Sequence, residues 1–265
     1  MLNNTINVLV LGDVVGRGGR NALIRNCSKI KETYNVDFLV VNGENASHGN
    51  GLTYKHYQEL VKAGCDCVTM GNHVYGKKEI YSYAKKADKL VIPANLNNLD
   101  EVFSDNLVYQ TVIKGKSIKV VNLLGIDNIK LDVKSAFVSF KEIYEQDPDS
   151  IYIVDYHAEL TAEKASLGYY LDGKASLMFG THTHIQTADE RIMPQGMAYI
   201  TDAGICGARE SMIGFNYKEV LKAIWEGTRY SVETKGQMML NGLLATIDLD
   251  SKRAIKIQRI NIDVE

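Results

Sequence analysis

Histidine, carboxylate and carboxamide side chains recur in this sequence directly after apolar segments. His182 and His184 follow the apolar residues 175–179 and are separated by a single threonine. Two neutral imidazoles held one residue apart can bind the same metal ion. Four other segments have the same form, an apolar run followed by residues of metal-ligand type. They contribute Asp13, then Glu44 and Asn45, then Asn72 and His73, and finally His157.

The apolar segments before these residues are typical of buried parallel strands. Residues 6–11, 38–41, 67–70 and 151–154 are short and largely apolar, as expected where both faces of a sheet are covered. Helical patterns separate the early segments, and this β-α-β order predicts parallel strands with right-handed crossovers. Ligands of such sheets bind beyond the carboxyl ends of the strands. The sequence therefore predicts that the polar residues meet at one edge of a sheet.

Helices and antiparallel strands are expected around these segments. Thr53 can cap a helix that ends at Gly64, and residues 107–113 and 117–124 form a predicted hairpin. The remaining predictions are helices over 23–34, 77–87, 133–144 and 217–225, and strands over 90–92, 198–201, 242–249 and 254–262. We expect an α/β protein with two mixed sheets packed face to face, helices outside, and one domain over residues 1–265.

The composition is that of an ordinary soluble globular protein. The chain has 265 residues, of which 45% are hydrophobic and 23% charged, with a formal net charge of -2. No basic field favours nucleic acid or an anionic membrane, and no apolar run reaches the roughly 20 residues that span a bilayer. The first residues lack a basic leader segment, so we expect a cytoplasmic protein. The four cysteines form no paired CxxC motif, which favours reduced, buried thiols.

The donor set indicates a metal site, although each member has a simpler explanation when considered alone. Asp13 could cap the next helix, Asn72 with His73 could form a turn, and His157 could be a core histidine. Four of the six histidines follow apolar segments, however, and this coincidence disfavours the separate explanations. Carboxylate, amide and imidazole donors without thiolate suit manganese, iron or zinc. The donors are too many for one tetrahedral ion, so we expect two metal ions bridged by Glu44.

Other polar residues offer weaker signals. The glycine-rich residues 12–19 resemble a phosphate-binding loop but lack its Lys-Ser/Thr ending. His56 is predicted on a helix surface. Candidates for substrate contact are His48 and Tyr75, together with Arg209, which could instead be a solvated loop charge.

The order of the motifs resembles that of the calcineurin-like metallophosphoesterases from about residue 6 to residue 204. The chain departs from the commonest pattern at two positions, with Val15 where most members have histidine and Glu44 where most have aspartate. In these departures it is similar to the bacterial YmdB-like phosphodiesterases. The segments that carry this similarity are Gly12-Asp13-Val14-Val15-Gly16, Val41-Asn42-Gly43-Glu44-Asn45-Ala46, Thr69-Met70-Gly71-Asn72-His73, Gly180-Thr181-His182-Thr183-His184 and 194–202.

The resemblance implies a four-layer α/β/β/α sandwich that holds two metals, often iron or manganese, and hydrolyses cyclic nucleotides such as 2′,3′-cyclic AMP. It further implies that Glu44 bridges the two metals and that His73 faces the substrate rather than a metal. The implied ligands of the first metal are Asp13, Glu44, Asn45 and His184, and those of the second are Glu44, Asn72, His157 and His182.

A two-metal mechanism follows as a hypothesis. Two cations about 3.5–4 Å apart lower the pKa of a bridging water toward about 7, and the hydroxide attacks phosphorus in line. His73 would protonate the leaving alkoxide. We expect small phosphodiesters as partners, with 3′,5′-cyclic AMP a second candidate substrate; self-association is left open. The alternatives are a phosphomonoesterase, nucleotidase or nuclease with the same site, or a metal-binding regulatory protein with little turnover.

Overall fold

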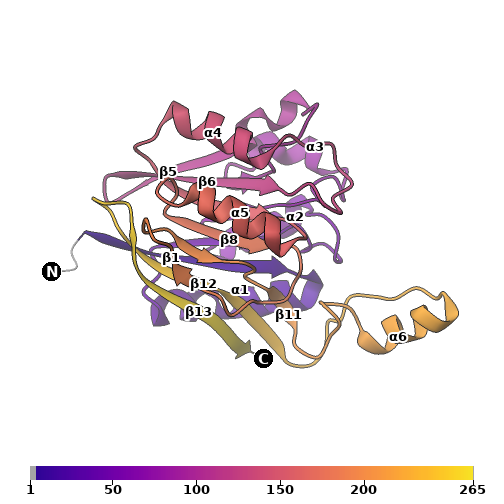
Figure 1. The fold of residues 1–265 in the computed structure, drawn as a ribbon. Coiled ribbons are helices and arrows are strands. Elements are labelled where there is room, and N and C mark those ends of the chain that lie inside the picture. Colours follow the sequence, from indigo (N-terminus) through magenta and orange to yellow (C-terminus); the bar gives the residue numbers. More distant parts are fainter. Residues whose placement is uncertain (1–3, 265) are drawn as a thin grey trace.

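A seven-stranded sheet combines strands from the beginning and the end of the chain in the computed structural model, which describes residues 4–264. Its order is β13-β12-β11-β1-β2-β3-β4, with β1 to β4 parallel and β12 and β13 antiparallel (Figure 1). The strands are β1 (Thr5–Val14), β2 (Phe38–Asn42), β3 (Cys67–Thr69), β4 (Leu90–Val91), β11 (Ile205–Ala208), β12 (Met238–Asp248) and β13 (Ala254–Val264). The parallel part directs the carboxyl ends of β1, β2 and β3 to one edge, as predicted.

A second sheet of six strands packs against the first. Its order is β5-β6-β7-β8-β10-β9, and β6, β7, β8 and β10 are parallel neighbours. The strands are β5 (Val108–Ile113), β6 (Lys116–Leu124), β7 (Ile151–His157), β8 (Leu177–Thr181), β9 (Arg191–Ile192) and β10 (Ala198–Ile200). The predicted hairpin of β5 and β6 is confirmed, with Lys114 and Gly115 at positive φ in its turn.

Helices cover the outer face of each sheet, so the layers are α/β/β/α, as expected. The helices are α1 (Gly16–Thr33), α2 (Tyr54–Ala63), α3 (Ile80–Tyr83), α4 (Ala136–Gln146), α5 (Thr161–Leu171) and α6 (Tyr217–Glu226), with 3₁₀ turns η1 (Ala84–Lys86) and η2 (Glu101–Asn106). Between the sheets, Val8 and Val40 share an apolar core with Ile153 and Phe179. Separate cores lie under α1 and α2 on one side and under α4 and α5 on the other.

Local chemistry explains where these helices begin and end. The Thr53 side chain accepts a hydrogen bond from the His56 backbone N–H at the start of α2, and Gly64 ends the helix at φ 111°, both as predicted. The predicted helix over 77–87 is wrong in extent, because only one α-helical turn and a 3₁₀ turn form there. Glu79, at the start of α3, makes no side-chain capping bond that would stabilise a longer helix.

Helix α5 and strand β11 are among the elements that the sequence did not predict. Helix α5 buries Lys164, Leu167, Gly168 and Leu171 at helical spacing. A charged residue and a glycine at two of these positions hide the apolar period that normally indicates a helix. The four-residue strand β11 lies in a segment for which the sequence predicts no helix or strand.

Helix α6 extends away from the two sheets, beyond the end of β1 (Figure 1). It forms where predicted, capped by the Asn216 side chain and ended by Gly227 at φ 67°. None of its residues is buried, and Trp225 is 86% exposed. Within residues 4–264, no helix is both long and apolar enough to cross a membrane.

Candidate metal centre

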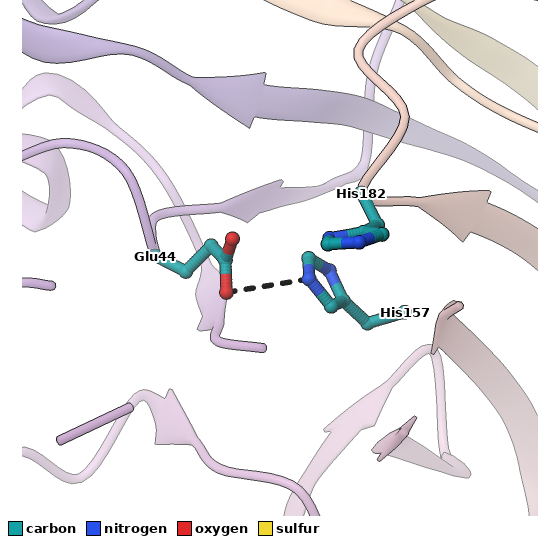
Figure 2. A group of neighbouring side chains, drawn as sticks. All are labelled: Glu44, His157 and His182. Atoms are coloured by element: carbon teal, nitrogen blue, oxygen red, sulfur yellow. Dashed lines mark ion pairs between the residues drawn. The ribbon is translucent and has the colours of Figure 1, made fainter. Parts of the chain in front are cut away.

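The eight predicted metal-ligand and catalytic residues lie at one edge of the two sheets. They follow or end strands β1, β2, β3, β7 and β8 and are connected through hydrogen bonds and short polar contacts. Ligand atoms of Glu44, His157 and His182 lie within 4.8 Å of one another. Figure 2 shows the three side chains converging, with the His157 ring facing the Glu44 carboxylate.

One group of contacts surrounds the His157 ring. Its Nε2 lies 2.7 Å from Asn72 Oδ1 and 3.3 Å from Glu44 Oε2. The His182 ring is 4.7 Å away from it, centroid to centroid, and its Nε2 contacts Glu159 Oε2 at 2.9 Å. This group contains the ligands expected of one metal ion.

A second group surrounds Asp13 and shares Glu44 with the first. His184 Nε2 lies 3.6 Å from Asp13 Oδ1, and Asp13 Oδ2 accepts the His182 backbone N–H at 3.1 Å. The Asn45 amide nitrogen lies 2.9 Å from Glu44 Oε1 and 3.1 Å from His184 Nε2. A half-turn of this carboxamide would direct Oδ1 inward, as a metal ligand requires.

Buried negative charge at this edge lacks a cationic partner of the usual kind. Asp13 and Glu44 are both 0% exposed, and within residues 4–264 no lysine or arginine pairs with either. Burial, followed by the charge of Asp13, raises the pKa of Glu44 to about 8. Burial opposes ionisation of Asp13, but the charge of His184 holds its pKa well below the usual range. Bound cations would supply the missing positive charge.

In His157 and His184, a hydrogen bond from Nδ1 fixes the ring so that Nε2 faces the centre of the site. His184 Nδ1 donates to the Ile213 carbonyl at 2.8 Å. The Thr181 hydroxyl donates to Asp155 Oδ1 at 2.6 Å, so His157 Nδ1 must donate to Thr181 Oγ1, 2.9 Å away. His157 Nε2 then carries no hydrogen, and its lone pair faces the oxygens of Asn72 and Glu44. An unprotonated imidazole nitrogen beside a carboxyl oxygen and a carboxamide oxygen is a set of donor atoms that fits a metal ion.

Asp155 is a supporting residue that the sequence analysis left without a role. It is fully buried, and its Oδ2 accepts hydrogen bonds from Thr69 Oγ1 at 2.5 Å and Asn42 Nδ2 at 3.0 Å. Asn42 Oδ1 in turn accepts the Glu44 backbone N–H at 3.1 Å. One carboxylate therefore orients ligands from both sheets. The available signal was an aspartate inside the apolar strand β7.

A glycine keeps the loop after β3 close to the ligands. A Cβ on Gly71 would fall against Glu44 Oε2 and against the His157 ring. The loop also donates the His73 backbone N–H to Glu44 Oε2 at 3.0 Å. Only glycine allows this approach, which places His73 at the mouth of the centre.

His73 differs from the ligand candidates in its exposure. Its side chain is 37% exposed, and Nδ1 lies 2.8 Å from Asn45 Oδ1. Its Nε2 has no hydrogen-bond partner within residues 4–264. Burial, then the charge of His182, lowers the pKa of His73. The ring is therefore anchored on one side and open to a ligand on the other.

A buried ion pair holds the loop that carries the two paired histidines. His182 and His184 have positive φ angles of 96° and 64°, which are strained for non-glycine residues. Asp202 Oδ2 accepts hydrogen bonds from the Thr183 N–H at 3.3 Å and its hydroxyl at 2.8 Å. Lys164 Nζ lies 2.6 Å from the same oxygen, and both side chains are 1% exposed. The pair therefore stabilises the loop.

Replacing Lys164 with methionine should destabilise the fold by about 3–5 kcal/mol, because it leaves Asp202 buried without a partner. Chemical denaturation would measure the change, and adding Asp202→Asn to Lys164→Met should restore part of the loss. The control is Lys141→Met, which removes an exposed pair with Glu145 and should cost less than about 1 kcal/mol. Equal effects of the two lysine substitutions would contradict the anchoring role.

Comparison with known proteins identifies the family. Residues 9–260 match the model of a family described as YmdB-like protein. A Bacillus subtilis (strain 168) protein named 2′,3′-cyclic-nucleotide 2′-phosphodiesterase is 40% identical over 262 residues, covering 97% of each chain. This chain belongs to the YmdB-like family.

Solved structures of similar proteins share the fold of this YmdB-like chain. A crystal structure described as a novel phosphatase from Mycoplasma pneumoniae has a TM-score of 0.91 and 36% identity, covering 98% of this chain and 94% of that one. A hypothetical protein from Thermus thermophilus has a TM-score of 0.86 and 29% identity, covering 98% and 100%. The expected metallophosphoesterase-like architecture is confirmed.

The three residues of this YmdB-like protein that were predicted to contact substrate have different surroundings in the structure. The Arg209 guanidinium binds Asp263 and Asn261 on β13, which does not support contact with a phosphate. The Tyr75 ring stacks on Tyr81, with ring centroids 5.8 Å apart, and also contacts Phe103. His48 alone is exposed beside a pocket, and its φ is 62°.

Proposed function

We propose that this protein hydrolyses cyclic nucleotides with two metal ions, with 2′,3′-cyclic AMP as the first candidate substrate and 3′,5′-cyclic AMP as the second. The main support is the position of Glu44, which contacts His157 through one oxygen and Asn45 through the other. It thereby connects two groups of ligand-type residues. The name of the Bacillus subtilis relative supports the substrate class.

The proposed ligands are the residues of the two groups. Asp13, Asn45 and His184 would hold one ion, Asn72, His157 and His182 the other, and Glu44 both. Oxygen and imidazole donors favour iron or manganese, and zinc is a further candidate. When bound, such ions neutralise phosphate oxygens and activate water for attack on phosphorus.

His73 is the proposed general acid. Its anchored Nδ1 and open Nε2 suit transfer of a proton to an oxygen that leaves the phosphorus. In a 2′,3′-cyclic nucleotide this oxygen belongs to ribose and is a poor leaving group unless it is protonated. Thr181 and Asp155 would act indirectly, by keeping His157 Nε2 directed inward.

Incubating the manganese-loaded protein with 2′,3′-cyclic AMP should release 3′-AMP, which chromatography identifies. This product requires cleavage of the bond between phosphorus and O2′. Removing the metals with a chelator should abolish turnover, and adding manganese back should restore it. Absence of product while two metals are bound would contradict the proposal, and hydrolysis of 3′-AMP itself would favour a phosphomonoesterase.

A further inference from the structure

A pocket of about 380 Å³ lies beside the candidate metal centre, and none of the candidate metal ligands lines it. Its lining comes from three segments, the start of α1, the loop that follows β2 and the part of the chain around α6. The residues that matter here are Gly16, Arg17, His48, Phe215, Tyr230 and Val232.

Both walls of the pocket are attached to candidate metal ligands. The backbone N–H groups of Gly16 and Gly49 each donate to the Asn45 carbonyl at 3.0 Å. The opposite wall follows Ile213, whose carbonyl accepts the His184 Nδ1–H at 2.8 Å. One wall is therefore attached to Asn45 and the other to His184, both of the second ligand group. A substrate bound at the metals would border the pocket.

Glycine geometry brings the two walls together. Gly16 and Gly49 have positive φ angles of 58° and 77°. A Cβ on either would lie within 2.7 Å of the Val232 side chain, and one on Gly49 would also approach Phe215 at 3.8 Å. Larger residues would push the segment with Val232 away from the centre.

The walls suit a flat aromatic ligand. Phe215 and Tyr230 form an edge-to-face pair with ring centroids 5.2 Å apart at 83°. Arg17 lines the same pocket, is exposed, and has no ion-pair or hydrogen-bond partner anywhere from residue 4 to residue 264. Nucleobases stack on aromatic side chains and on guanidinium groups.

We propose that this pocket receives the base of the nucleotide, with Phe215 and Tyr230 as the stacking wall and Arg17 against the other face of the base. The proposal rests on the proposed function and adds the residues that would distinguish a nucleotide from other cyclic phosphates. Stacking is tolerant of base identity, so it predicts preference for a base rather than for adenine alone.

Tyr230→Ala tests the proposal, because Tyr230 is 52% exposed and contributes little to the core. The substrates are 2′,3′-cyclic AMP and glycerol 1,2-cyclic phosphate, which has the same five-membered ring but no base. The variant should lower kcat/KM for 2′,3′-cyclic AMP by about 5- to 150-fold and leave glycerol 1,2-cyclic phosphate unaffected. Tyr230→Phe keeps the ring and should recover most of the loss seen with Tyr230→Ala. Tyr169→Ala, which removes an exposed tyrosine of α5, should behave as native.

Binding of 3′-AMP to the metal-free protein, measured by calorimetry, gives a second readout that Tyr230→Ala should weaken. Equal losses for both substrates, or unchanged nucleotide turnover with unchanged 3′-AMP binding, would overturn the base pocket while the proposed function stands. If the native metallated protein hydrolyses neither cyclic phosphate, the proposed function itself fails and the base pocket falls with it.

Discussion

Replacing Glu44 with glutamine should remove bound metal and nearly all phosphodiesterase activity. The side chain is fully buried and contacts members of both ligand groups. An amide of the same shape has no charge to offset two cations and only one oxygen to offer them. The loss in metal affinity should exceed the about 10- to 100-fold cost of removing a hydrogen-bond partner of a ligand. Elemental analysis of the purified variant and its kcat/KM would measure both effects.

Glu142→Gln is the matched control, since it makes the same chemical change on the exposed face of α4. It should keep both the metal content and the activity of the native protein. A Glu44→Gln variant that is folded and still binds two metals would contradict the bridging role. In the metal-free protein the same substitution should not destabilise the fold, because it removes a buried carboxylate that lacks a lysine or arginine partner in residues 4–264.

The parallel sheet was predictable because its strands are buried on both faces. β1 and β2 are nearly continuous apolar runs, so their ends, and with them Asp13 and Glu44, could be located from sequence. Helix α5 could not, because Lys164 and Gly168 occupy its buried face. Contacts with distant parts of the chain explain both residues. Lys164 pairs with Asp202, and a Cβ on Gly168 would meet the Tyr199 ring.

Residues in long loops were less predictable than residues at strand ends. A strand end directs its side chains to a known edge of the sheet, whereas a loop side chain takes its direction from the neighbours it meets. The direction of Arg209, for example, is set by Asp263 of β13, which lies 54 positions further along the chain. Phe215 and Tyr230 are 15 positions apart, on either side of α6, and only the folded chain brings their rings together.

Replacing His73 with alanine should lower kcat for 2′,3′-cyclic AMP by about 10²- to 10⁴-fold, the range expected when a general acid is lost. Metal content should remain, because His73 contributes its backbone N–H rather than a ring nitrogen to Glu44 Oε2. His73→Asn is the sharper variant, since its amide can still form a hydrogen bond with the Asn45 carboxamide but cannot act as an acid near neutral pH. Both variants should therefore be slow while retaining metal.

The leaving group separates an acid from a residue that only positions the substrate. Bis(p-nitrophenyl) phosphate releases p-nitrophenolate, which needs little protonation, whereas 2′,3′-cyclic AMP releases a ribose alkoxide. If His73 donates the proton, His73→Ala should slow the cyclic nucleotide far more than the aryl ester. Equal losses for both substrates would show that the ring binds the phosphate or orders the loop after β3 instead. Unchanged turnover of 2′,3′-cyclic AMP would remove His73 from the mechanism, since no step of the reaction would then depend on its open Nε2.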